Sequence, residues 1–385
     1  MQEEQLRFPG RVALLTNIIP PYRLSLYQCL QQSIGELRIY LSQTMESNRA
    51  WPVEWEDLPV VIQRTVTLRR TWRHPGGFAE AMDLHLPLDT LVLLRRFRPA
   101  VVISAEMGMR SLQAAWYCRR PGCRWVVWAT VSERTEQGRG LLRRSLRRWL
   151  LSRADAVLVN GESGFRYVRS FRIDKKKICR VPYTTDNDPF LSIPQWEDNP
   201  ENIHRLLFVG QLVDRKGLRQ FLPVLCRWLE EHPERRVRLV VVGDGPLRPW
   251  LESLKAPANL ALQFAGNQPY ERLPSYYAQA DALVFPTLAD EWGLVVNEAL
   301  AAGVPILGSI HSQAVEELVD EGRQGWTFNP EKEANIYQAI ERAFSTPGDE
   351  LKKMRKAARE RIAQVTPEEA TRRILDVLDS VSSRP

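Results

Sequence analysis

The chain has 385 residues, of which 44% are hydrophobic and 26% are charged, and its formal net charge is +7. A chain of this length can bury a large core and is expected to form two domains. The composition excludes a disordered chain. It also excludes a membrane-spanning helix, because no apolar run approaches the roughly 18 residues that a span requires.

Positive charge is concentrated in the first half of the chain. Residues 1–190 contain 30 Lys and Arg against 18 Asp and Glu, whereas residues 191–385 contain 23 against 28. The first half therefore has a net charge of +12 and the second half one of −5. This asymmetry predicts an anionic partner for the first half, which is membrane lipid, an anionic acceptor or nucleic acid.

The cysteines and the first residues predict a cytoplasmic protein. The cysteines number five, an odd count, and they are scattered without the spacing of a zinc site, so no metal is expected. The first five residues lack the basic-then-apolar order of a signal peptide. Peripheral contact with the inner face of a membrane is compatible with both observations.

In chain order, the first half alternates between strand and helix patterns. A strand at 12–16 runs into a loop that contains Pro20 and Pro21, and a helix begins near Leu24. Further strands are predicted at 37–41, 60–68, 101–104, 124–130, 156–160 and 178–181, and helices at 88–97, 110–117, 140–152 and 162–171. This alternation is typical of the α/β class with a doubly wound parallel sheet.

Side chains that follow these strands are candidates for chemistry, because ligands of such sheets bind at the carboxyl ends of the strands. Arg23, in the loop after the first strand, either meets an anionic acceptor or faces solvent. Glu106 and Glu133 each follow a later strand, where a carboxylate can orient or deprotonate an acceptor hydroxyl. We expect both carboxylates to face a site, and the alternative is that they pair with Arg110 and Arg134.

The segment 139–153 is predicted to be an arginine-rich amphipathic helix. One face carries Leu142, Leu146, Trp149 and Leu150, and the opposite face carries Arg143, Arg144, Arg147 and Arg148. The simplest packing places the leucines on the sheet and leaves the four arginines in solvent. The arginine face is then a candidate contact for anionic lipid headgroups or for the acceptor.

A polar, proline-containing segment at 186–202 predicts a linker between two domains. A second alternation of strands and helices then runs from about 205 to 329, and the tail at 331–381 is predicted to be helical throughout. We therefore expect one domain at 1–190, a second at 191–366 and a terminal helix at 367–385.

Two loops of the second domain suit phosphate binding. The first loop follows a strand at 205–210 and contains Gly210, Gln211, Arg215 and Lys216. The second loop runs from the strand at 240–242 into Gly243 and Gly245. Backbone N–H groups and a lysine can bind phosphate in such loops, and the alternatives are a solvated basic turn and a simple chain reversal.

The stretch Asp290–Pro305 predicts a helix start that can bind an anion. It is expected to form a β-α-β unit with a strand at 282–286, a loop ending at Gly293, a helix at 294–302 and a strand at 304–308. The N–H groups of Leu294 and Val295 would meet a diphosphate, and carboxylates on either side would meet hydroxyl groups. A nucleotide-sugar fits this pattern, and the alternative is a capped helix with an acidic, solvated first turn.

Asp290 and Glu298, ahead of Ala-Leu-Ala-Ala-Gly-Val-Pro, resemble the acid-x7-Glu signature of the retaining glycosyltransferases of family 4, whose first acid is usually Glu. The loop at 210–217 resembles the family's Gly-Arg-x4-Lys-Gly pattern, with Gln211 in place of the arginine. The resemblance implies the GT-B architecture, in which two doubly wound Rossmann-like domains face each other across a cleft. It also implies that the last helix crosses back onto the first domain.

The resemblance further implies a retaining, metal-independent, hexosyltransferase-like enzyme that uses a nucleoside-diphosphate sugar and no cofactor. Lys216 would hold the diphosphate, Glu298 the ribose and Asp290 the donor sugar. The expected donor contacts are Gly210, Gln211, Arg215, Lys216, Gly243, Gly245, Gly293, Leu294, Val295 and Glu298. The acceptor, a lipid-linked, polysaccharide or other glycan, would enter through the basic first domain.

Two other functions are considered. A nucleotide-sugar epimerase shares the two-domain architecture, but epimerases resemble motifs other than the acid-x7-Glu helix. A non-enzymatic nucleic-acid-binding protein would use the arginines, but no basic groove interleaved with aromatic residues is evident and the second half is acidic. Nucleic acid is therefore not expected as a partner.

Overall fold

The computed structural model describes residues 8–45, 55, 57–194 and 203–383. The chain divides into two compact units. Unit 1 comprises residues 1–186 and 365–385, and unit 2 comprises residues 187–364. Each unit is built around a parallel sheet, so the predicted α/β class with two doubly wound sheets is confirmed.

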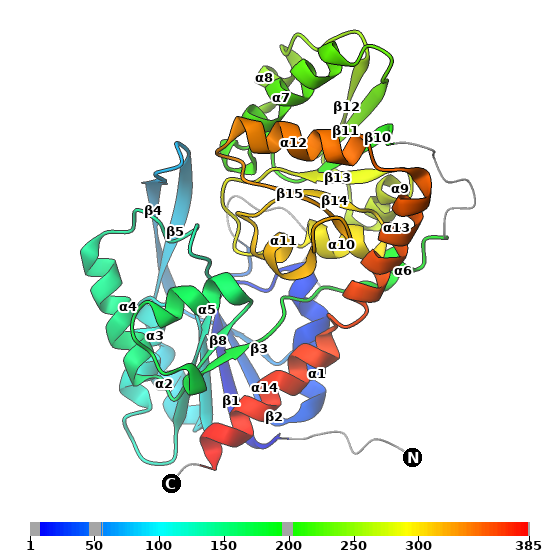
Figure 1. Ribbon diagram of the computed structural model, residues 1–385. Helices are drawn as coiled ribbons and strands as arrows, with labels where there is room; N and C mark the ends of the chain where they lie inside the picture. Colours follow the sequence, from blue (N-terminus) through cyan, green and yellow to red (C-terminus); the bar gives the residue numbers. More distant parts are fainter. Residues whose placement is uncertain (1–7, 46–54, 56, 195–202, 384–385) are drawn as a thin grey trace, which may run out of the picture. The chain divides into compact units, whose positions relative to one another are not determined.

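The sheet of unit 1 has seven parallel strands in the order β3-β2-β1-β6-β7-β8-β9 (Figure 1). The strands are β1 Phe8–Thr16, β2 Ile34–Leu41, β3 Val60–Ile62, β6 Val101–Ala105, β7 Arg124–Ala129, β8 Ala156–Val159 and β9 Ile178–Arg180. Its helices before the terminal one are α1 Leu24–Ser33, α2 Thr90–Phe97, α3 Met109–Tyr117, α4 Leu141–Arg153 and α5 Glu162–Arg169. The strand order reverses between β1 and β6, and the carboxyl ends of these two strands are where such a sheet binds ligands.

The last helix, α14 Pro367–Ser382, belongs to unit 1. The hydroxyl of Thr366 caps it by accepting a hydrogen bond from the N–H of Glu369. Its buried residues Ile374 and Leu378 join the apolar cluster formed by the strands and by α1. The chain therefore returns to its first sheet at the end, because this apolar stripe needs a surface to cover it.

A hairpin interrupts unit 1 where a single strand was predicted at 60–68, and this prediction is wrong. The chain leaves the sheet after β3 and forms β4 Thr65–Arg73 and β5 Ala79–Pro87, which pair with each other in antiparallel fashion as a separate two-stranded sheet. The turn contains Pro75, Gly76 and Gly77, and Gly77 has a φ of 86°. A glycine-rich turn of this kind ends one strand and begins its partner.

The sheet of unit 2 has six parallel strands in the order β12-β11-β10-β13-β14-β15. The strands are β10 Arg205–Val209, β11 Val237–Val242, β12 Leu260–Gly266, β13 Ala282–Phe285, β14 Ile306–Ser309 and β15 Gly325–Phe328. The α-helices of this unit are α6 Asp188–Leu191, α7 Leu218–Glu231, α8 Arg248–Glu252, α9 Leu273–Tyr277, α10 Val295–Ala301, α11 Gln313–Leu318, α12 Glu333–Phe344 and α13 Gly348–Ile362.

The tail at 331–381 is helical, as predicted, and it divides into α12, α13 and α14, since Pro347 and Pro367 each stand where a new helix begins. Within the predicted linker at 186–202, α6 is ordered, because Phe190 is fully buried with its ring 5.3 Å from that of Tyr277. Residues 195–202 of that segment lie outside the described residues.

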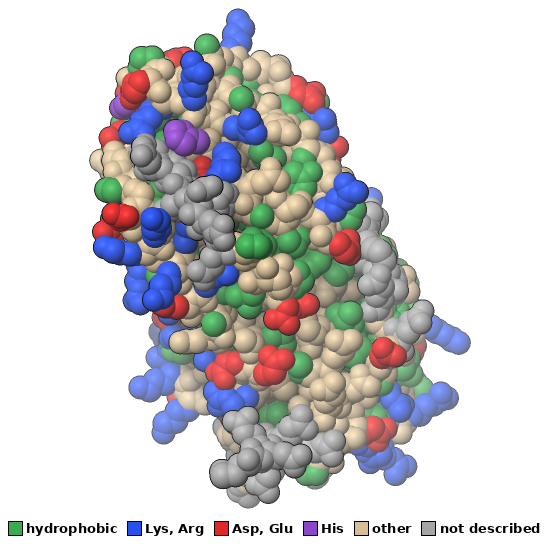
Figure 2. Space-filling model, turned by 90° about the vertical axis from the view of Figure 1, so that its right-hand side faces the viewer, with side chains coloured by type: hydrophobic (Ala, Val, Ile, Leu, Met, Phe, Trp, Pro, Cys, Tyr) green, Lys and Arg blue, Asp and Glu red, His purple; other side chains and the backbone are tan. Residues whose placement is uncertain are grey.

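The surface mixes charges with apolar side chains. Figure 2 shows Lys and Arg side chains interspersed with Asp and Glu on one face, with hydrophobic side chains between them. Among the described residues, no helix has the length and hydropathy that crossing a membrane requires.

Candidate functional site

The loop after β10 is fixed against the end of β13 by one glycine. Gly217 has a φ of 75°, and a Cβ placed on it would lie 1.9 Å from the carbonyl oxygen of Pro286. No residue other than glycine fits this close approach without moving the backbone. The approach brings Arg215 and Lys216 to the carboxyl end of β13, where the N–H of Leu288 donates to the carbonyl of Arg215 at 2.8 Å.

Arg215, Lys216 and Asp290 form one charge cluster. The Nζ of Lys216 lies 2.6 Å from Oδ2 of Asp290, and Nη1 of Arg215 lies 3.3 Å from the same oxygen. Burial alone would raise the pKa of Asp290, but the two cations outweigh it and lower this pKa to about 2. Asp290 is therefore ionised at neutral pH, and the cluster has a net charge of +1. Arg215 and Lys216, which are predicted to bind the donor, thus contact Asp290, which is predicted to bind the donor sugar.

Glu298 is buried inside unit 2. It has 6% of its surface exposed, and the Tyr277 hydroxyl donates a hydrogen bond of 2.7 Å to its Oε2. Burial raises the pKa of Glu298 to about 7, although the hydrogen bond from Tyr277 opposes this shift. The carboxyl is thus poised between its charged and neutral forms near neutral pH. The alternative of a solvated acidic turn is wrong for this residue.

The loop that leads into α10 also depends on a glycine. Gly293 has a φ of 106°, and a Cβ on it would lie 2.5 Å from the ring of Phe285. Ser312 donates a hydrogen bond of 2.5 Å to the carbonyl of Trp292, and the indole of Trp292 donates one of 2.8 Å to Asn297. Leu294 is the N-cap of α10 and Val295 is its first residue, so their N–H groups lie at the start of the helix.

The predicted nucleotide loop packs against the predicted phosphate loop. A Cβ on Gly243 would lie 2.0 Å from the carbonyl oxygen of Gly210, and one on Gly245 would lie 2.6 Å from that of Leu212. Both glycines have positive φ values, 127° and 154°. The two loops are therefore in backbone contact at the carboxyl ends of β10 and β11, and Gln211 lies between Gly210 and Leu212 in this contact region.

In unit 1, Glu106 belongs to a polar cluster at the carboxyl end of β6. It has a φ of 72°, a conformation that L-residues rarely adopt, and its side chain is 49% exposed. The side-chain amide of Asn17 donates to the carboxylate of Glu106, and the hydroxyl of Ser111 donates to its backbone carbonyl. Backbone strain of this kind costs of order 1–3 kcal/mol and persists only where the surroundings impose it.

Arg110 is a buried residue that contacts several members of this cluster. It is 3% exposed, its Nη2 donates to Oδ1 of Asn17 at 2.7 Å and to the hydroxyl of Ser42, and its Nη1 lies 3.7 Å from the carboxylate of Glu106. Asn17 follows β1, Ser42 follows β2 and Glu106 follows β6. One buried arginine thus connects the ends of three neighbouring strands. The predicted alternative, pairing of Glu106 with Arg110, is what the structure has.

Glu133 lies on the surface of unit 1. Its side chain is 42% exposed and pairs with Arg166 at 2.7 Å, and its N–H donates to the hydroxyl of Ser163 at 2.9 Å. The predicted pairing with Arg134 is replaced by the one with Arg166. The structure therefore leaves Glu133 accessible, but it does not connect it with the Glu106 cluster.

The prediction that α4 leaves four arginines in solvent is wrong. Arg147 is 3% exposed, contacts the buried carboxylate of Glu136 and donates to the hydroxyl of Tyr167 at 2.6 Å. Arg143 is half-buried and lies 3.6 Å from Glu136. The two arginines turn inward because Glu136 provides a buried anion, whereas Arg144 and Arg148 are exposed.

The same rotation moves the predicted apolar face outward at the start of the helix. Leu141 and Leu142 are 84% and 87% exposed, and the buried leucines are Leu150 and Leu151. Leu142 was expected to pack on the sheet, and this expectation is also wrong.

Arg23 does not face solvent, so that alternative for it is wrong, and contact with an acceptor stays a prediction. It is 5% exposed, and its guanidinium lies 3.7 Å from the centre of the Tyr183 ring and 4.7 Å from that of Trp128. Stacking on aromatic faces stabilises a guanidinium that has lost its water. Arg23 therefore anchors the start of α1 to the sheet.

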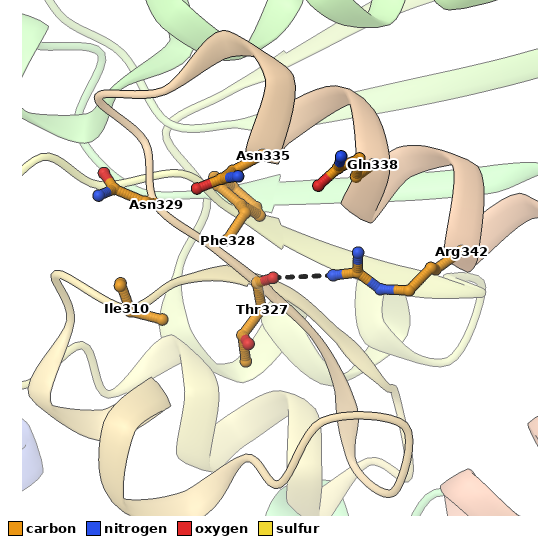
Figure 3. A pocket seen from close by; sticks show the side chains of 7 residues that line it. All are labelled: Ile310, Thr327, Phe328, Asn329, Asn335, Gln338 and Arg342. Atoms are coloured by element: carbon orange, nitrogen blue, oxygen red, sulfur yellow. Dashed lines mark hydrogen bonds between the residues drawn. The ribbon is translucent and has the colours of Figure 1, made fainter.

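A shallow pocket of about 300 Å³ lies at the carboxyl ends of β14 and β15 (Figure 3). It is lined by Ile310, Thr327, Phe328, Asn329, Asn335, Gln338 and Arg342. Arg342 donates to the carbonyl of Thr327 at 3.1 Å and pairs with Glu321. None of the predicted donor ligands lines this pocket. Among the described residues, no group of three or more His, Cys, Asp and Glu side chains is placed to hold a metal ion.

Sequence reasoning missed Tyr277, Asn17 and Ser42. The pairing of Glu106 with Arg110 could be predicted, because the two residues are four positions apart next to the start of a helix. Tyr277 reaches Glu298 from a separate helix 21 residues earlier, and no local pattern predicts such a contact. Asn17 and Ser42 meet because their strands are neighbours, which follows from strand order and not from sequence spacing.

The fold and the site together define a class. Two parallel α/β units, with a lysine, an arginine and two carboxylates at the strand ends of the second unit, are typical of enzymes that bind nucleotide ligands at the carboxyl ends of their strands. Comparison with known proteins identifies the family. The family model "Glycosyl transferases group 1" matches residues 192–361, and the "Glycosyl transferase 4-like domain" matches residues 19–184. The chain belongs to the group 1 glycosyltransferases, of the family 4 type.

Curated relatives share part of this chain. The 2-deoxystreptamine N-acetyl-D-glucosaminyltransferase of Streptomyces fradiae is 25% identical over 284 residues, which are 71% of this chain and 62% of the relative. The uncharacterized glycosyltransferase MJ1607 of Methanocaldococcus jannaschii is 30% identical over 145 residues, which are 37% of this chain and 36% of the relative. The alignments thus span between about a third and three fifths of the relatives' own length.

Solved structures share the fold over nearly the whole chain. Sucrose-phosphate synthase from Thermosynechococcus elongatus superposes with a TM-score of 0.71 at 16% identity, covering 96% of this chain and 98% of that one. HepE of Anabaena in complex with UDP gives a TM-score of 0.70 at 14% identity, covering 96% and 100%. At these identities the similarity shows the fold alone, and it confirms the GT-B class.

Proposed function

We propose that the protein is a retaining glycosyltransferase that moves a sugar from a nucleoside-diphosphate sugar to a hydroxyl group of a glycan or lipid-linked acceptor. The observation that carries the proposal is the cluster of Arg215, Lys216 and Asp290 beside the start of α10, in a chain of the group 1 family. HepE of Anabaena, which shares the fold, was solved with UDP-glucose. That likeness supports a nucleotide-sugar donor for this chain.

The donor diphosphate is assigned to Lys216, Arg215 and the start of α10. The cluster has a net charge of +1, so it attracts an anion even while Asp290 is ionised. As the sugar–phosphate bond breaks, negative charge grows on the departing diphosphate. Two fixed cations at that point stabilise this charge more than they stabilise the bound donor, which is the condition for lowering the barrier. These cations provide that stabilisation without a bound metal.

The two carboxylates are assigned to hydroxyl groups of the donor. Asp290 accepts from a hydroxyl of the sugar, next to the cations that hold the diphosphate. Glu298 accepts from the ribose, and Tyr277 fixes its orientation with a hydrogen bond of 2.7 Å. A hydroxyl that enters this buried position supplies a second donor, which favours the charged form of Glu298 and lowers its pKa from about 7.

The acceptor is assigned to unit 1, with Glu106 as the group that contacts its reacting hydroxyl. Glu106 is half-exposed at a strand end, and Asn17 and Arg110 hold its position. The strained φ of 72° places this carboxylate at the carboxyl end of β6. Glu133, on the surface of the same unit, is assigned to more distant parts of the acceptor.

A thermal-shift screen of UDP-, GDP- and ADP-sugars tests the proposal. One donor class is expected to raise the unfolding temperature of the wild type, because a ligand that binds the native state stabilises it. Glu298→Ala should abolish that shift, while Glu350→Ala, an exposed acid on α13, should preserve it. If no nucleotide-sugar stabilises the wild type and Glu298→Ala changes nothing, the assignment fails.

A further inference from the structure

Exposed apolar side chains are concentrated in one stretch of the sequence of unit 1. Among the described residues, eleven large hydrophobic side chains are exposed, and ten of them lie between residues 62 and 142. They are Ile62, Val66, Leu68, Leu84, Leu88, Val92, Met109, Trp116, Leu141 and Leu142. Where such side chains form a contiguous patch, that patch marks a contact with a partner or a membrane.

The β4–β5 hairpin carries part of this surface on one face. Leu68 is directly opposite Leu84 in the pairing register, and Val66 is two residues from Leu68 on the same strand, so the three share one face. Their exposed fractions are 46% for Val66, 43% for Leu68 and 41% for Leu84. Figure 1 shows the hairpin extending away from the seven-stranded sheet as a separate ribbon.

The hairpin is fixed to the segment that leads into α4. His74 Nε2 lies 2.7 Å from the carbonyl oxygen of Arg134, and the guanidinium of Arg139 lies 3.4 Å from the centre of the Trp72 ring. A Cβ on Gly138 would lie 2.7 Å from the ring of Pro75. Helix α4 begins only two residues after Arg139, so Leu141 and Leu142, the most exposed leucines among the described residues, lie close to the hairpin.

We call these five side chains, Val66, Leu68, Leu84, Leu141 and Leu142, the hairpin–helix surface. Its surroundings are basic. On α4, Leu141, Arg144 and Arg148 follow each other at helical spacing, and all three are exposed. On the hairpin, Arg70 is exposed on the same face as Leu68 and Leu84, and Arg64 is exposed just before the first strand. The exposed Arg69 and Arg73 lie on the opposite face, where Arg69 pairs with Asp83 at 3.3 Å.

We propose that the hairpin–helix surface docks on a lipid bilayer containing anionic lipids. Apolar side chains flanked by arginines match a bilayer interface, where the leucines enter the acyl boundary and the guanidinium groups meet phosphate headgroups. Of the arginine face of α4 expected from the sequence, Arg144 and Arg148 flank this surface, whereas Arg147 is buried against Glu136. The proposal goes beyond the transfer reaction and does not depend on it.

A second copy of the chain fits this surface less well. In a symmetric dimer the same patch faces itself, so the arginines around the five side chains would lie opposite arginines. Like charges brought together in this way oppose association. Anionic headgroups complement the same arrangement, and the charge therefore favours the bilayer.

Vesicle flotation with the full-length protein tests the proposal. The wild type should float with phosphatidylcholine vesicles containing 30% phosphatidylglycerol, a probe composition of our choosing, and bind far less to pure phosphatidylcholine. Leu141→Ser with Leu142→Ser should lower the partition coefficient at least about tenfold, since each leucine loses its insertion into the acyl layer. Both side chains are more than four-fifths exposed, so folding is unaffected.

Substitutions of the arginines test the proposal independently of the leucines. Arg144→Glu with Arg148→Glu should weaken binding by roughly twentyfold or more, given about fivefold for each cation near an anionic surface. The matched controls are Ile310→Ser, an exposed apolar residue of unit 2, and Lys175→Glu with Lys176→Glu, exposed cations elsewhere on unit 1. Neither control should change flotation. Equal flotation of surface variants and controls would overturn the proposal, as would no flotation of the wild type, or a concentration-dependent dimer that the leucine variants dissolve.

Discussion

The environment of Glu298 moves the titration of its carboxyl into the neutral pH range. A carboxyl of ordinary pKa 4.5 is held at about 7 by burial, next to a tyrosine that donates to it. Its folded-state pKa lies above its unfolded-state value, so the folded state binds the extra proton. The stability that results is complete below about pH 4.5 and is lost as the pH rises through 7.

Replacing Glu298 by Gln should therefore remove a pH dependence. Between pH 5 and pH 8 the unfolding free energy of the wild type should fall by up to about 3 kcal/mol through this group, and that of Glu298→Gln should not. The measurement is the difference in unfolding midpoint between the two proteins across this range. Glu350→Gln, at an exposed position, is the control. Parallel curves for wild type and Glu298→Gln would contradict the burial of a titrating carboxyl.

The Asp290→Asn variant separates the role of Asp290 in the charge cluster from the roles of Lys216 and Arg215. This substitution removes an anion that competes with the diphosphate for Lys216 and Arg215, so the affinity for a nucleoside diphosphate without sugar should rise about fivefold. The rate of sugar transfer should fall by about a hundredfold, because the sugar contact is lost.

Isothermal titration and a transfer assay measure the two effects on Asp290→Asn. Asp214→Asn is the matched control, since Asp214 lies two residues from Lys216 but pairs with Arg219 at 2.7 Å. A loss of diphosphate affinity in Asp290→Asn would mean that the aspartate supports the phosphate site instead of competing for it.

At the scale of elements, the strand-to-helix loops of unit 2 are set by backbone contacts that only glycine allows. Gly217→Ala would place a methyl group 1.9 Å from the carbonyl oxygen of Pro286 while keeping a φ of 75°. The loss of stability should exceed about 2 kcal/mol, since steric overlap adds to the backbone strain.

The Gly322→Ala variant measures the effect of backbone strain without steric overlap. Gly322 has a φ of 74° in the same unit, and a Cβ on it would meet no atom within 4 Å. Its replacement should cost only about 1 kcal/mol. Urea unfolding of both variants makes the comparison, and equal losses would show that the contact with Pro286 is not what requires a glycine.

How far the sequence predicts each element depends on whether its determinants are local. The β-α-β unit around Gly293 was predicted with its helix, because glycine, strand and helix signals are adjacent in the chain. The orientation of α4 was not, because the buried partner of Arg147 is Glu136, in the loop before the helix, and the alternation of leucine and arginine is equally compatible with either rotation. The Tyr277–Glu298 contact depends on tertiary packing alone.

At the scale of the whole molecule, the charge asymmetry divides roles between the units. The basic half of the sequence forms most of unit 1, which carries the Glu106 cluster and the hairpin–helix surface. The acidic half forms most of unit 2, in which Arg215 and Lys216 lie at the strand ends, where a diphosphate would bind. Helix α14 packs on unit 1, so unit 1 is formed by two separate stretches of the chain.

The central claim is that Lys216 stabilises the departing diphosphate of a nucleotide-sugar. Release of nucleoside diphosphate, measured on the donor that stabilises the wild type most, tests it directly. Lys216→Met should lower kcat by about a hundredfold or more, as expected when a charge that acts in the transition state is removed. Lys352→Met, at an exposed lysine of α13, should leave the rate unchanged. A Lys216→Met protein that releases the diphosphate at the wild-type rate would contradict the account.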